Sequence, residues 1–160
     1  MAKSAFFQRD NGARKLLKEL SGAGVVLRVG VFGDNAARAA EGDSGATLGE
    51  VAAGHEFLIP AHQPRSWLRA TVDEERAAIE TNLRRAAAAV ASGKMTQVQA
   101  LNLLGLFIVG KIQQRISRGI PPALSEKYEA RKLEKYPGAT TPLIASGQLR
   151  QAVSAEVTAK

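Results

Sequence analysis

The sequence contains no cysteine, and aromatic residues make up only 5% of its 160 residues. Without thiols, neither a disulfide framework nor a thiolate metal site can form, and a reducing cytoplasm is compatible with this composition. Few aromatic residues together with abundant alanine favour close helix packing over an aromatic-rich β-sandwich. A chain of this length suits one domain. We therefore expect a single α+β domain over residues 1–160, weighted towards helix.

Long hydrophobic runs are also missing. The most apolar stretch, residues 103–109, is far shorter than the roughly 20 residues that span a bilayer, so we expect it in the core. Residues 1–20 contain one apolar pair, Phe6-Phe7, and lack the apolar stretch of a signal peptide. We expect neither a membrane partner nor export by that route.

The formal net charge is +7, and most of the excess lies late in the chain. Residues 1–93 contain 12 Lys and Arg against 11 Asp and Glu, whereas residues 94–160 contain 10 against 4. A basic surface attracts nucleic acid or an acidic protein face, but many single-domain surfaces are as basic with neither partner. Charge alone therefore leaves a functional basic face and a solvated face both open.

Apolar periodicity predicts a helix and a strand early in the chain. Residues 11–20 carry leucines at helical spacing, which indicates a short amphipathic helix. Residues 24–32 alternate and are rich in valine, which predicts a strand whose Leu27, Val29 and Val31 face meets the helices.

The strand is followed by residues 33–46, which are small, polar and glycine-rich. Such a composition predicts a flexible loop, and a loop of this length commonly binds a partner or becomes ordered on assembly. Asp34 and Arg38 in this loop are candidate subunit contacts.

Three helices are predicted to begin at capping boxes, in which a threonine and a Glu or Gln three residues later bond each other's backbone N–H. The pairs are Thr47 with Glu50, Thr71 with Glu74, and Thr96 with Gln99. They predict helices over residues 48–57, 71–91 and 98–118. The second should bury one apolar stripe: Val72, Ile79, Leu83, Ala86 and Val90.

The longest predicted helix, residues 98–118, is expected to be the centre of the core. Its apolar positions follow helical spacing and cover a wide arc: Leu101, Leu103, Leu104, Leu106, Phe107, Ile108, Val109, Ile112 and Ile116. Gly105 and Gly110 each weaken the helix by roughly 1 kcal/mol relative to alanine, so they indicate the close approach of another helix or strand.

Prolines and a second alternating run organise the C-terminal part. Pro121-Pro122 forces a break, and Ser125 can cap a short helix over residues 126–135. Residues 143–153 predict a last short helix or turn. Residues 154–158 alternate as a strand that can pair antiparallel with residues 24–32. The predicted fold is a small antiparallel sheet packed against a long central helix, with several shorter helices.

No catalytic or metal-binding pattern is present. His55 and His62 are seven residues apart, so the two-histidine helical spacing of a zinc protease is absent. Asp73, Glu74 and Glu75 fall at a predicted helix N-terminus, where free backbone N–H groups stabilise negative charge, which favours capping over catalysis. We expect a protein that is not an enzyme and has no metal or cofactor.

Two prolines in residues 59–69 predict an extended surface segment. Within it, Arg65 and Arg69 flank Trp67, and this combination is enriched at interface hot spots. The alternative is that Trp67 fills the core. The sequence leaves both interpretations open.

Seven basic residues late in the chain are candidate contacts with phosphate: Lys111, Arg115, Arg118, Lys127, Arg131, Lys132 and Lys135. No interleaved aromatic residues and no nucleic-acid-reading motif accompany them. Any DNA contact is therefore expected to be nonspecific and sensitive to salt. A solvated face is the other interpretation.

Two segments, residues 47–71 (TLGEVAAGHEFLIPAHQPRSWLRAT) and residues 119–157 (GIPPALSEKYEARKLEKYPGATTPLIASGQLRQAVSAEV), resemble the small neck, tail-completion and virion-morphogenesis proteins of tailed bacteriophages. In that family a helix reading like "evaxxhEF" leads into "IPxRxfLRxt", and a long helical region precedes "GIxPPLsxxTxxxK" and "tPLixtGqLrxsisyxV". Residues 47–71 match at Glu50, Val51, His55, Glu56, Phe57, Ile59, Pro60, Arg65, Leu68, Arg69 and Thr71. Residues 119–157 match at Gly119, Pro121, Pro122, Leu124, Ser125, Lys132, Thr141, Pro142, Leu143, Ile144, Gly147, Gln148, Leu149 and Val157.

The chain departs from the family pattern in two places. Leu58 stands where the family commonly has glycine after "HEF". The compact "IPxR" is lengthened by an insertion before Arg65. We therefore expect the approach to Trp67 to differ from that in relatives.

The resemblance implies a virion structural protein at the neck or the head-proximal end of the tail, assembled in the host cytoplasm. It implies a ring of identical copies, for example a hexamer, that contacts the head–tail connector and tail tube proteins. Candidate interface residues are Asp34, Arg38, Arg65, Trp67 and Arg69, and the basic C-terminal residues are candidates for a lumen that contacts packaged DNA. Tail terminator, neck adaptor and assembly chaperone all remain open. The competing hypothesis is a basic protein that binds nucleic acid nonspecifically.

Overall fold

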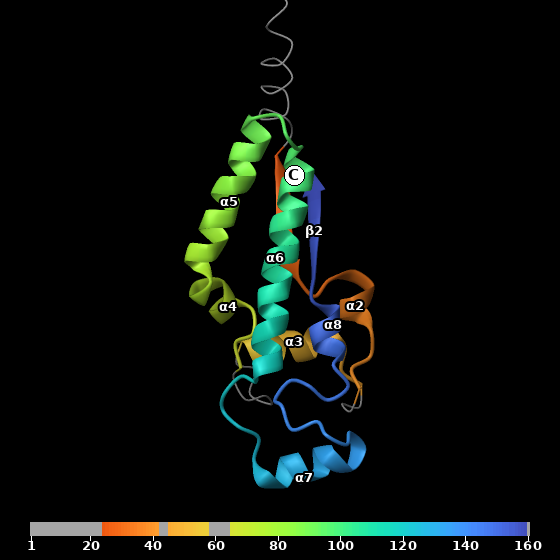
Figure 1. Ribbon diagram of the computed structural model, residues 1–160. Helices are drawn as coiled ribbons and strands as arrows, with labels where there is room; N and C mark the ends of the chain where they lie inside the picture. Colours follow the sequence, from red (N-terminus) through yellow and green to blue (C-terminus); the bar gives the residue numbers. More distant parts are fainter. Residues whose placement is uncertain (1–23, 42–44, 58–64, 160) are drawn as a thin grey trace, which may run out of the picture.

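The computed structural model describes residues 24–41, 45–57 and 65–159. Within these ranges the chain forms a two-stranded antiparallel sheet and seven helices in an elongated body (Figure 1). The order is β1 (Val25–Gly30), α2 (Gly33–Ala37), α3 (Leu48–Phe57), α4 (Arg69–Glu74), α5 (Arg76–Ala91), α6 (Gln97–Arg118), α7 (Glu126–Lys135), α8 (Gln148–Ala152) and β2 (Ser154–Ala159). The α+β prediction is confirmed. The helix predicted over residues 11–20 lies outside the described residues.

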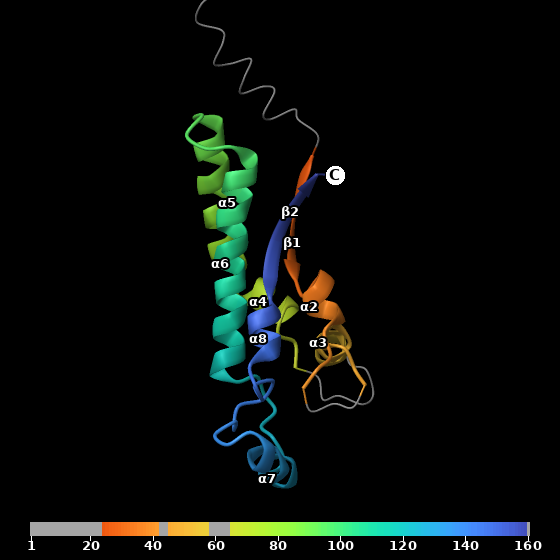
Figure 2. The same ribbon diagram turned by 90° about the vertical axis from the view of Figure 1, so that its right-hand side faces the viewer.

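Strands β1 and β2 pair along their whole length, as their alternation predicts. Val25 lies opposite Ala159, and Gly30 lies opposite Ser154. Helix α6 runs along one face of the sheet (Figure 2), where Leu27 packs against the core, and α5 packs against α6. On the other face, Arg28 and Glu156 form a cross-strand ion pair at 3.3 Å.

Helix α6 is the centre of the core, and it begins at the predicted capping box. Thr96 N–H donates to Gln99 Oε1 at 2.9 Å, and Gln99 N–H donates to Thr96 Oγ1 at 3.2 Å. The core face of the helix is fully apolar, and Ile112 and Ile116 have no exposed surface. This face meets both the sheet and α5.

The two glycines of α6 have different surroundings. A Cβ at Gly105 would lie 2.7 Å from Ala155 Cβ and 2.9 Å from Leu27 Cδ1, so glycine lets the sheet approach the helix closely. The predicted close approach is confirmed there. A Cβ at Gly110 would have no neighbour within 4 Å. For Gly110 the predicted close approach is wrong within the described residues, because none of their elements packs closely against it.

The helix predicted to start at a Thr71 capping box is divided in the structure. Helix α4 begins at Arg69, and the chain departs from helical geometry at Glu75 before α5. Thr71 is buried inside α4, where its Oγ1 donates to Trp67 O at 2.6 Å, so it caps nothing. The predicted apolar stripe is only partly buried, because Val72 and Leu83 are exposed.

Residues 33–46 do not form one continuous loop. Helix α2 occupies the first part, and Ala39 forms an isolated antiparallel bridge with Thr47. The predicted capping box then starts α3: Thr47 N–H donates to Glu50 Oε2 at 2.7 Å, and Glu50 N–H donates to Thr47 Oγ1 at 3.2 Å. Residues 42–44 lie outside the described residues.

Candidate functional site

Glu56 caps helix α4 from the neighbouring helix α3. Its side chain is only 1% exposed. The carboxylate accepts hydrogen bonds at 2.9–3.0 Å from Ser66 Oγ and from the backbone N–H groups of Trp67, Leu68 and Arg69. These N–H groups lie at the helix start, where no intrahelical acceptor exists. The cap therefore comes from more than ten residues away in the sequence.

The pKa of Glu56 is set by two opposing effects. Burial raises the pKa, but the hydrogen bonds from Leu68, Arg69 and Ser66 outweigh burial and hold it below the ordinary value of 4.5. The Arg69 guanidinium adds an ion pair at 2.8 Å and also lies 4.9 Å from the centre of the Phe57 ring. The Glu56 carboxylate therefore stays charged while it accepts hydrogen bonds from the backbone at the start of α4.

Two of the predicted interface residues serve the fold instead. Trp67 is 3% exposed, and its Nε1 donates to Ala52 O at 3.0 Å, so it fills the core as the second interpretation has it. Arg65 is 6% exposed and donates to the carbonyls of Ile120 and Pro122. Arg69 keeps a 59% exposed side chain despite its bond to Glu56.

The other two predicted interface residues lie around α2. Asp34 is in the helix, Arg38 follows it, and both are exposed. The structure does not bring them together with Arg69, which starts helix α4.

Two of the three basic residues of α6 are paired within the chain. Lys111 Nζ lies 3.1 Å from Glu75 Oε1, and Arg115 Nη1 pairs with Glu74 Oε2. These two acids were predicted to cap a helix start. They instead connect the α4–α5 junction to α6, which corrects that prediction. Arg118 is exposed at the end of α6.

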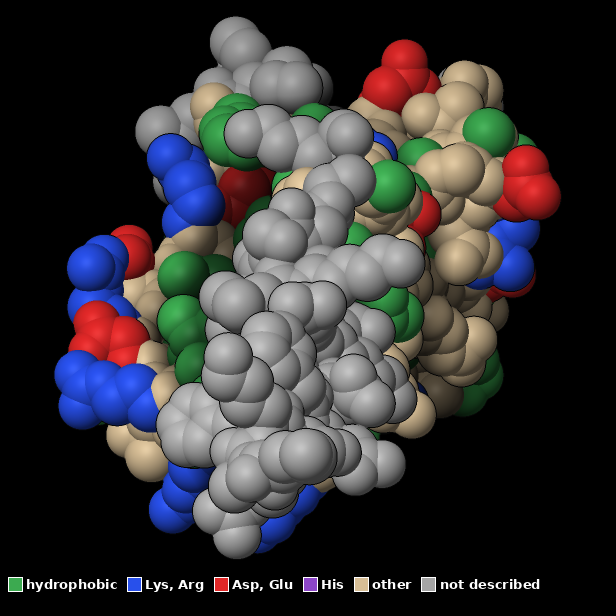
Figure 3. Space-filling view, turned by 90° about the horizontal axis from the view of Figure 1, so that it is seen from above, with side chains coloured by type: hydrophobic (Ala, Val, Ile, Leu, Met, Phe, Trp, Pro, Cys, Tyr) green, Lys and Arg blue, Asp and Glu red, His purple; other side chains and the backbone are tan. Residues whose placement is uncertain are grey.

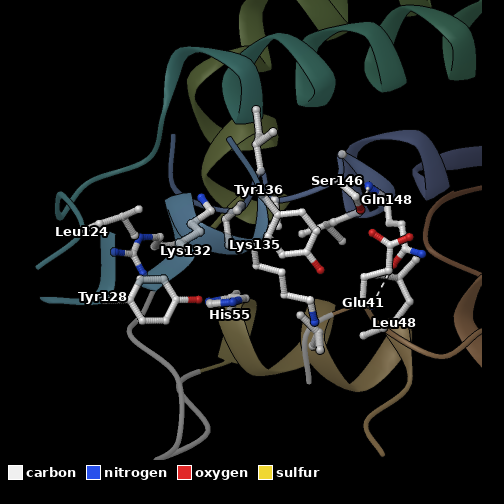
Figure 4. A pocket seen from close by; sticks show the side chains of 18 of the residues that line it. Glu41, Leu48, His55, Leu124, Tyr128, Lys132, Lys135, Tyr136, Ser146 and Gln148 are labelled. Atoms are coloured by element: carbon white, nitrogen blue, oxygen red, sulfur yellow. Dashed lines mark hydrogen bonds between the residues drawn. The ribbon is translucent and has the colours of Figure 1, made fainter. Parts of the chain in front are cut away.

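Three of the four basic residues of α7 line a cavity of about 850 Å³, here called the α7 cavity. It lies between α3, α7 and the segment that leads into α8 (Figure 4). Arg131, Lys132 and Lys135 line it, and Arg65 contributes from the segment before α4. Lys127 lies on the same helix but outside the lining.

Arg65 and Lys132 are buried cations. Lys132 is 9% exposed, and its Nζ donates to Thr141 O at 2.7 Å. Burial lowers the pKa of Arg65, although Tyr128 opposes this. Burial also lowers the pKa of Lys132, with Glu129 opposing the shift and the charge of Arg65 adding to it. Within the described ranges, neither cation forms an ion pair with a carboxylate.

A second surface feature is the side of α6 that faces away from the sheet, here called the outer face of α6. It follows helical spacing and contains no charged residue: Gln99, Leu103, Leu106, Gly110, Gln114 and Ser117. Leu103 is 58% exposed and Leu106 is 67% exposed. The prediction that these leucines belong to the core is therefore wrong. A hollow beside Gly110 is bordered by residues of α6 and α8.

The outer flank of α5 is very different from the outer face of α6. It carries ion pairs between Arg84 and Glu80 at 3.6 Å and, at the α4–α5 junction, between Arg76 and Asp73 at 3.4 Å. Figure 3 shows basic and acidic side chains alternating along the left flank, the side on which α5 lies in Figure 1. Such a surface is well solvated.

The sequence contained a signal for the outer face of α6 that the prediction did not use. Apolar residues between positions 98 and 109 surround most of the helix, and one domain of this size cannot cover all of them. No local sequence pattern predicted that Glu56 caps α4, because its hydrogen-bond partners lie ten or more residues later in the chain.

The described residues contain no group of three or more His, Asp or Glu side chains placed to hold a metal ion. Among the helices in the described ranges, none is long and apolar enough to cross a bilayer.

Comparisons of the chain with protein-family models, with curated proteins and with solved structures gave no match. The phage resemblance therefore remains a prediction from residues 47–71 and 119–157. Several of its matching residues have folding roles: Glu56 caps α4, while Arg65 and Lys132 hold backbone carbonyls.

Proposed function

We propose that this chain is a structural subunit that assembles with copies of itself, and that the assembly is a ring at the head–tail junction of a tailed bacteriophage. The observation that carries self-association is the outer face of α6, which is exposed, uncharged and carries two leucines. Depletion of charge distinguishes the centre of a protein interface from the remaining surface. The location at the head–tail junction is supported by the resemblance of residues 47–71 and 119–157.

Gly110 supports a contact at this face. Glycine inside a helix costs about 1 kcal/mol relative to alanine. No described atom lies within 4 Å of the position that a Cβ would take, so packing within the described chain does not require glycine. A helix or strand of a second subunit that approaches closely at this point supplies the reason.

The nucleic-acid-binding alternative has less support from the surface. Lys111 and Arg115 are paired with acids, and Lys132 is buried. Of the seven candidate cations, the exposed ones are Arg118, Lys127, Arg131 and Lys135.

Self-association is tested by measuring the mass of the purified chain over a range of concentrations, by light scattering after size exclusion. We expect oligomers that Leu106→Asp shifts to the monomer, because a carboxylate would be buried without a partner. The matched control is Leu83→Asp, which changes an exposed leucine of α5 and should leave the oligomers intact. Equal disruption by both variants contradicts an interface at the outer face of α6.

The location is tested by electron microscopy of phage particles assembled with the chain. We expect a ring of density at the head-proximal end of the tail, and labelling elsewhere in the particle contradicts a neck role. A stable monomer or dimer that retards DNA at physiological salt favours the nucleic-acid-binding alternative.

A further inference from the structure

The α7 cavity combines recessed positive charge with an apolar floor. We propose that it binds an acidic peptide segment of a partner protein, which places a carboxylate against Arg65 and Lys132 and an apolar side chain on the floor. This site lies apart from the outer face of α6 and does not depend on self-association.

Positive charge in the cavity is in excess. Among the described residues, Arg65, Arg131, Lys132 and Lys135 line it against one lining carboxylate, that of Glu41, and Glu129 offsets part of the charge of Lys132. Burying a cation is costly unless an anion or a set of hydrogen bonds compensates it. Arg65 and Lys132 have backbone carbonyls as acceptors, which carry only partial charge. A carboxylate entering the cavity supplies the missing charge, and bonds between charged partners are the strong ones.

The floor of the cavity selects for an apolar neighbour of that carboxylate. It consists of aliphatic side chains from α3, from the segment that leads into α8 and from α8 itself: Leu48, Val51, Leu143, Ile144 and Leu149. The volume of about 850 Å³ lies within the range of ligand-binding sites. A peptide segment offers both a charged and an apolar side chain in one short stretch.

The depth of the cations favours a peptide over nucleic acid. Arg65 is 6% exposed and Lys132 is 9% exposed, so the convex backbone of a duplex cannot reach them. Its phosphates reach only the outer cations, Arg131 and Lys135, which lie over the rings of Tyr128 and Tyr136 at 5.3 and 5.6 Å. A single Asp or Glu side chain is much narrower than a duplex, and Figure 4 shows Lys132, Tyr128 and Tyr136 on the border of the cavity.

The test begins with an array of random heptapeptides probed with the full-length chain. We expect the bound peptides to be enriched in Asp or Glu next to Leu, Ile or Val. The best of them, labelled with fluorescein, is then measured by fluorescence anisotropy beside its Asn/Gln analogue, which should bind about tenfold more weakly. An array without enrichment for acids, or an analogue that binds equally well, overturns the proposal.

Substitutions of cations test whether the peptide binds in the α7 cavity. Lys132→Gln removes the charge but keeps a donor for Thr141 O, and we expect it to weaken peptide binding about tenfold. The double variant Arg131→Gln with Lys135→Gln tests the exposed cations without disturbing a buried contact, and it should weaken binding similarly. Thermal unfolding establishes that each variant is folded. The matched control, Lys127→Gln, changes a cation of the same helix outside the lining, and the proposal fails if this variant loses as much affinity.

Two further measurements separate this proposal from its rivals. An oligonucleotide that binds more tightly than the peptide, with the same dependence on Lys132, overturns the peptide in favour of nucleic acid. Leu106→Asp should bind the peptide as well as the unchanged chain does, so a failure of self-association and a failure of the α7 cavity give different results.

Discussion

In the part of the molecule formed by β1, β2, α5 and α6, here called the hairpin part, the buried side chains are apolar, whereas the lower part around α3, α4 and α7 buries charged side chains beside its apolar core residues (Figure 1). In the hairpin part, Ile112 is fully buried and Gly105 lets the sheet approach α6 closely. In the lower part, Glu56, Arg65 and Lys132 are buried, and each bonds backbone groups.

The difference follows from the kind of backbone that each part contains. Strands and helices satisfy their own N–H and C=O groups, so apolar packing is sufficient to hold them together. The chain turns of the lower part leave backbone groups without regular partners. Glu56 is an acceptor and meets three N–H groups, while Arg65 and Lys132 are donors and meet carbonyls. Each buried charge thus matches the backbone groups that lack partners.

The largest effect is expected from Glu56→Gln in the lower part. The amide group of glutamine cannot accept from all the donors that now meet the carboxylate, and it turns its own donors towards them. Breaking a buried charged network of this kind costs about 3 to 5 kcal/mol of unfolding free energy. Urea titration measures the change. The matched control is Glu80→Gln on α5, whose exposed carboxylate should matter by about 0.5 kcal/mol or less. Equal effects at both sites contradict the role assigned to Glu56.

The second-largest effect is expected in the hairpin part, where apolar packing is tested by removing a buried side chain. Ile112→Ala leaves a cavity at the centre of the hairpin part and should cost about 3 kcal/mol. Leu106→Ala, six residues earlier in the same helix, removes an exposed side chain and should change the stability of the monomer by about 0.5 kcal/mol or less. Urea unfolding at a concentration where the chain is monomeric compares the two. A large loss at Leu106 places it in the core of the monomer and removes the proposed interface.

The two glycines of α6 should respond to alanine with opposite signs. Gly105→Ala forces Cβ against Ala155 and should cost about 1 to 2 kcal/mol, because overpacking exceeds the gain in helix propensity. Gly110→Ala meets open space and should stabilise the monomer by up to about 1 kcal/mol. The same Gly110 variant should weaken the oligomer. Calorimetry measures the stability of both variants, and light scattering measures the oligomer that Gly110→Ala should weaken. A Gly110→Ala monomer that is less stable than the unchanged chain contradicts the open space assigned to Gly110.

The smallest effect is the pH dependence that Glu56 adds, because burial opposes the hydrogen bonds that lower its pKa. A pKa below 4.5 in the folded chain means that the charged carboxylate stabilises the fold above that pH, and that this contribution is lost as pH falls through the folded-state pKa. Unfolding free energies at pH 7 and pH 3 should therefore differ more for the unchanged chain than for Glu56→Gln. Equal acid sensitivity of the two proteins contradicts the lowered pKa.

Local chemistry in the sequence determined many elements of this protein. Thr47 and Thr96 cap the helices that their capping boxes predict, because both partners lie within four residues. Alternation predicted β1 and β2, and the two strands pair antiparallel as expected. Both kinds of signal are complete within a few neighbouring residues.

Tertiary structure alone decided the features that depend on distant segments. Thr71 has the same capping pattern as Thr47, yet Glu56 already caps that helix and Thr71 is buried. Likewise, Leu106 fits an apolar arc as well as Ile112 does, but the sheet and α5 can cover only one part of the helix circumference. The sequence determined which residues are able to cap, pack or carry charge. The fold decided which of them are used within the chain and which remain available on its surface, because that depends on the limited area that each neighbouring element can bury.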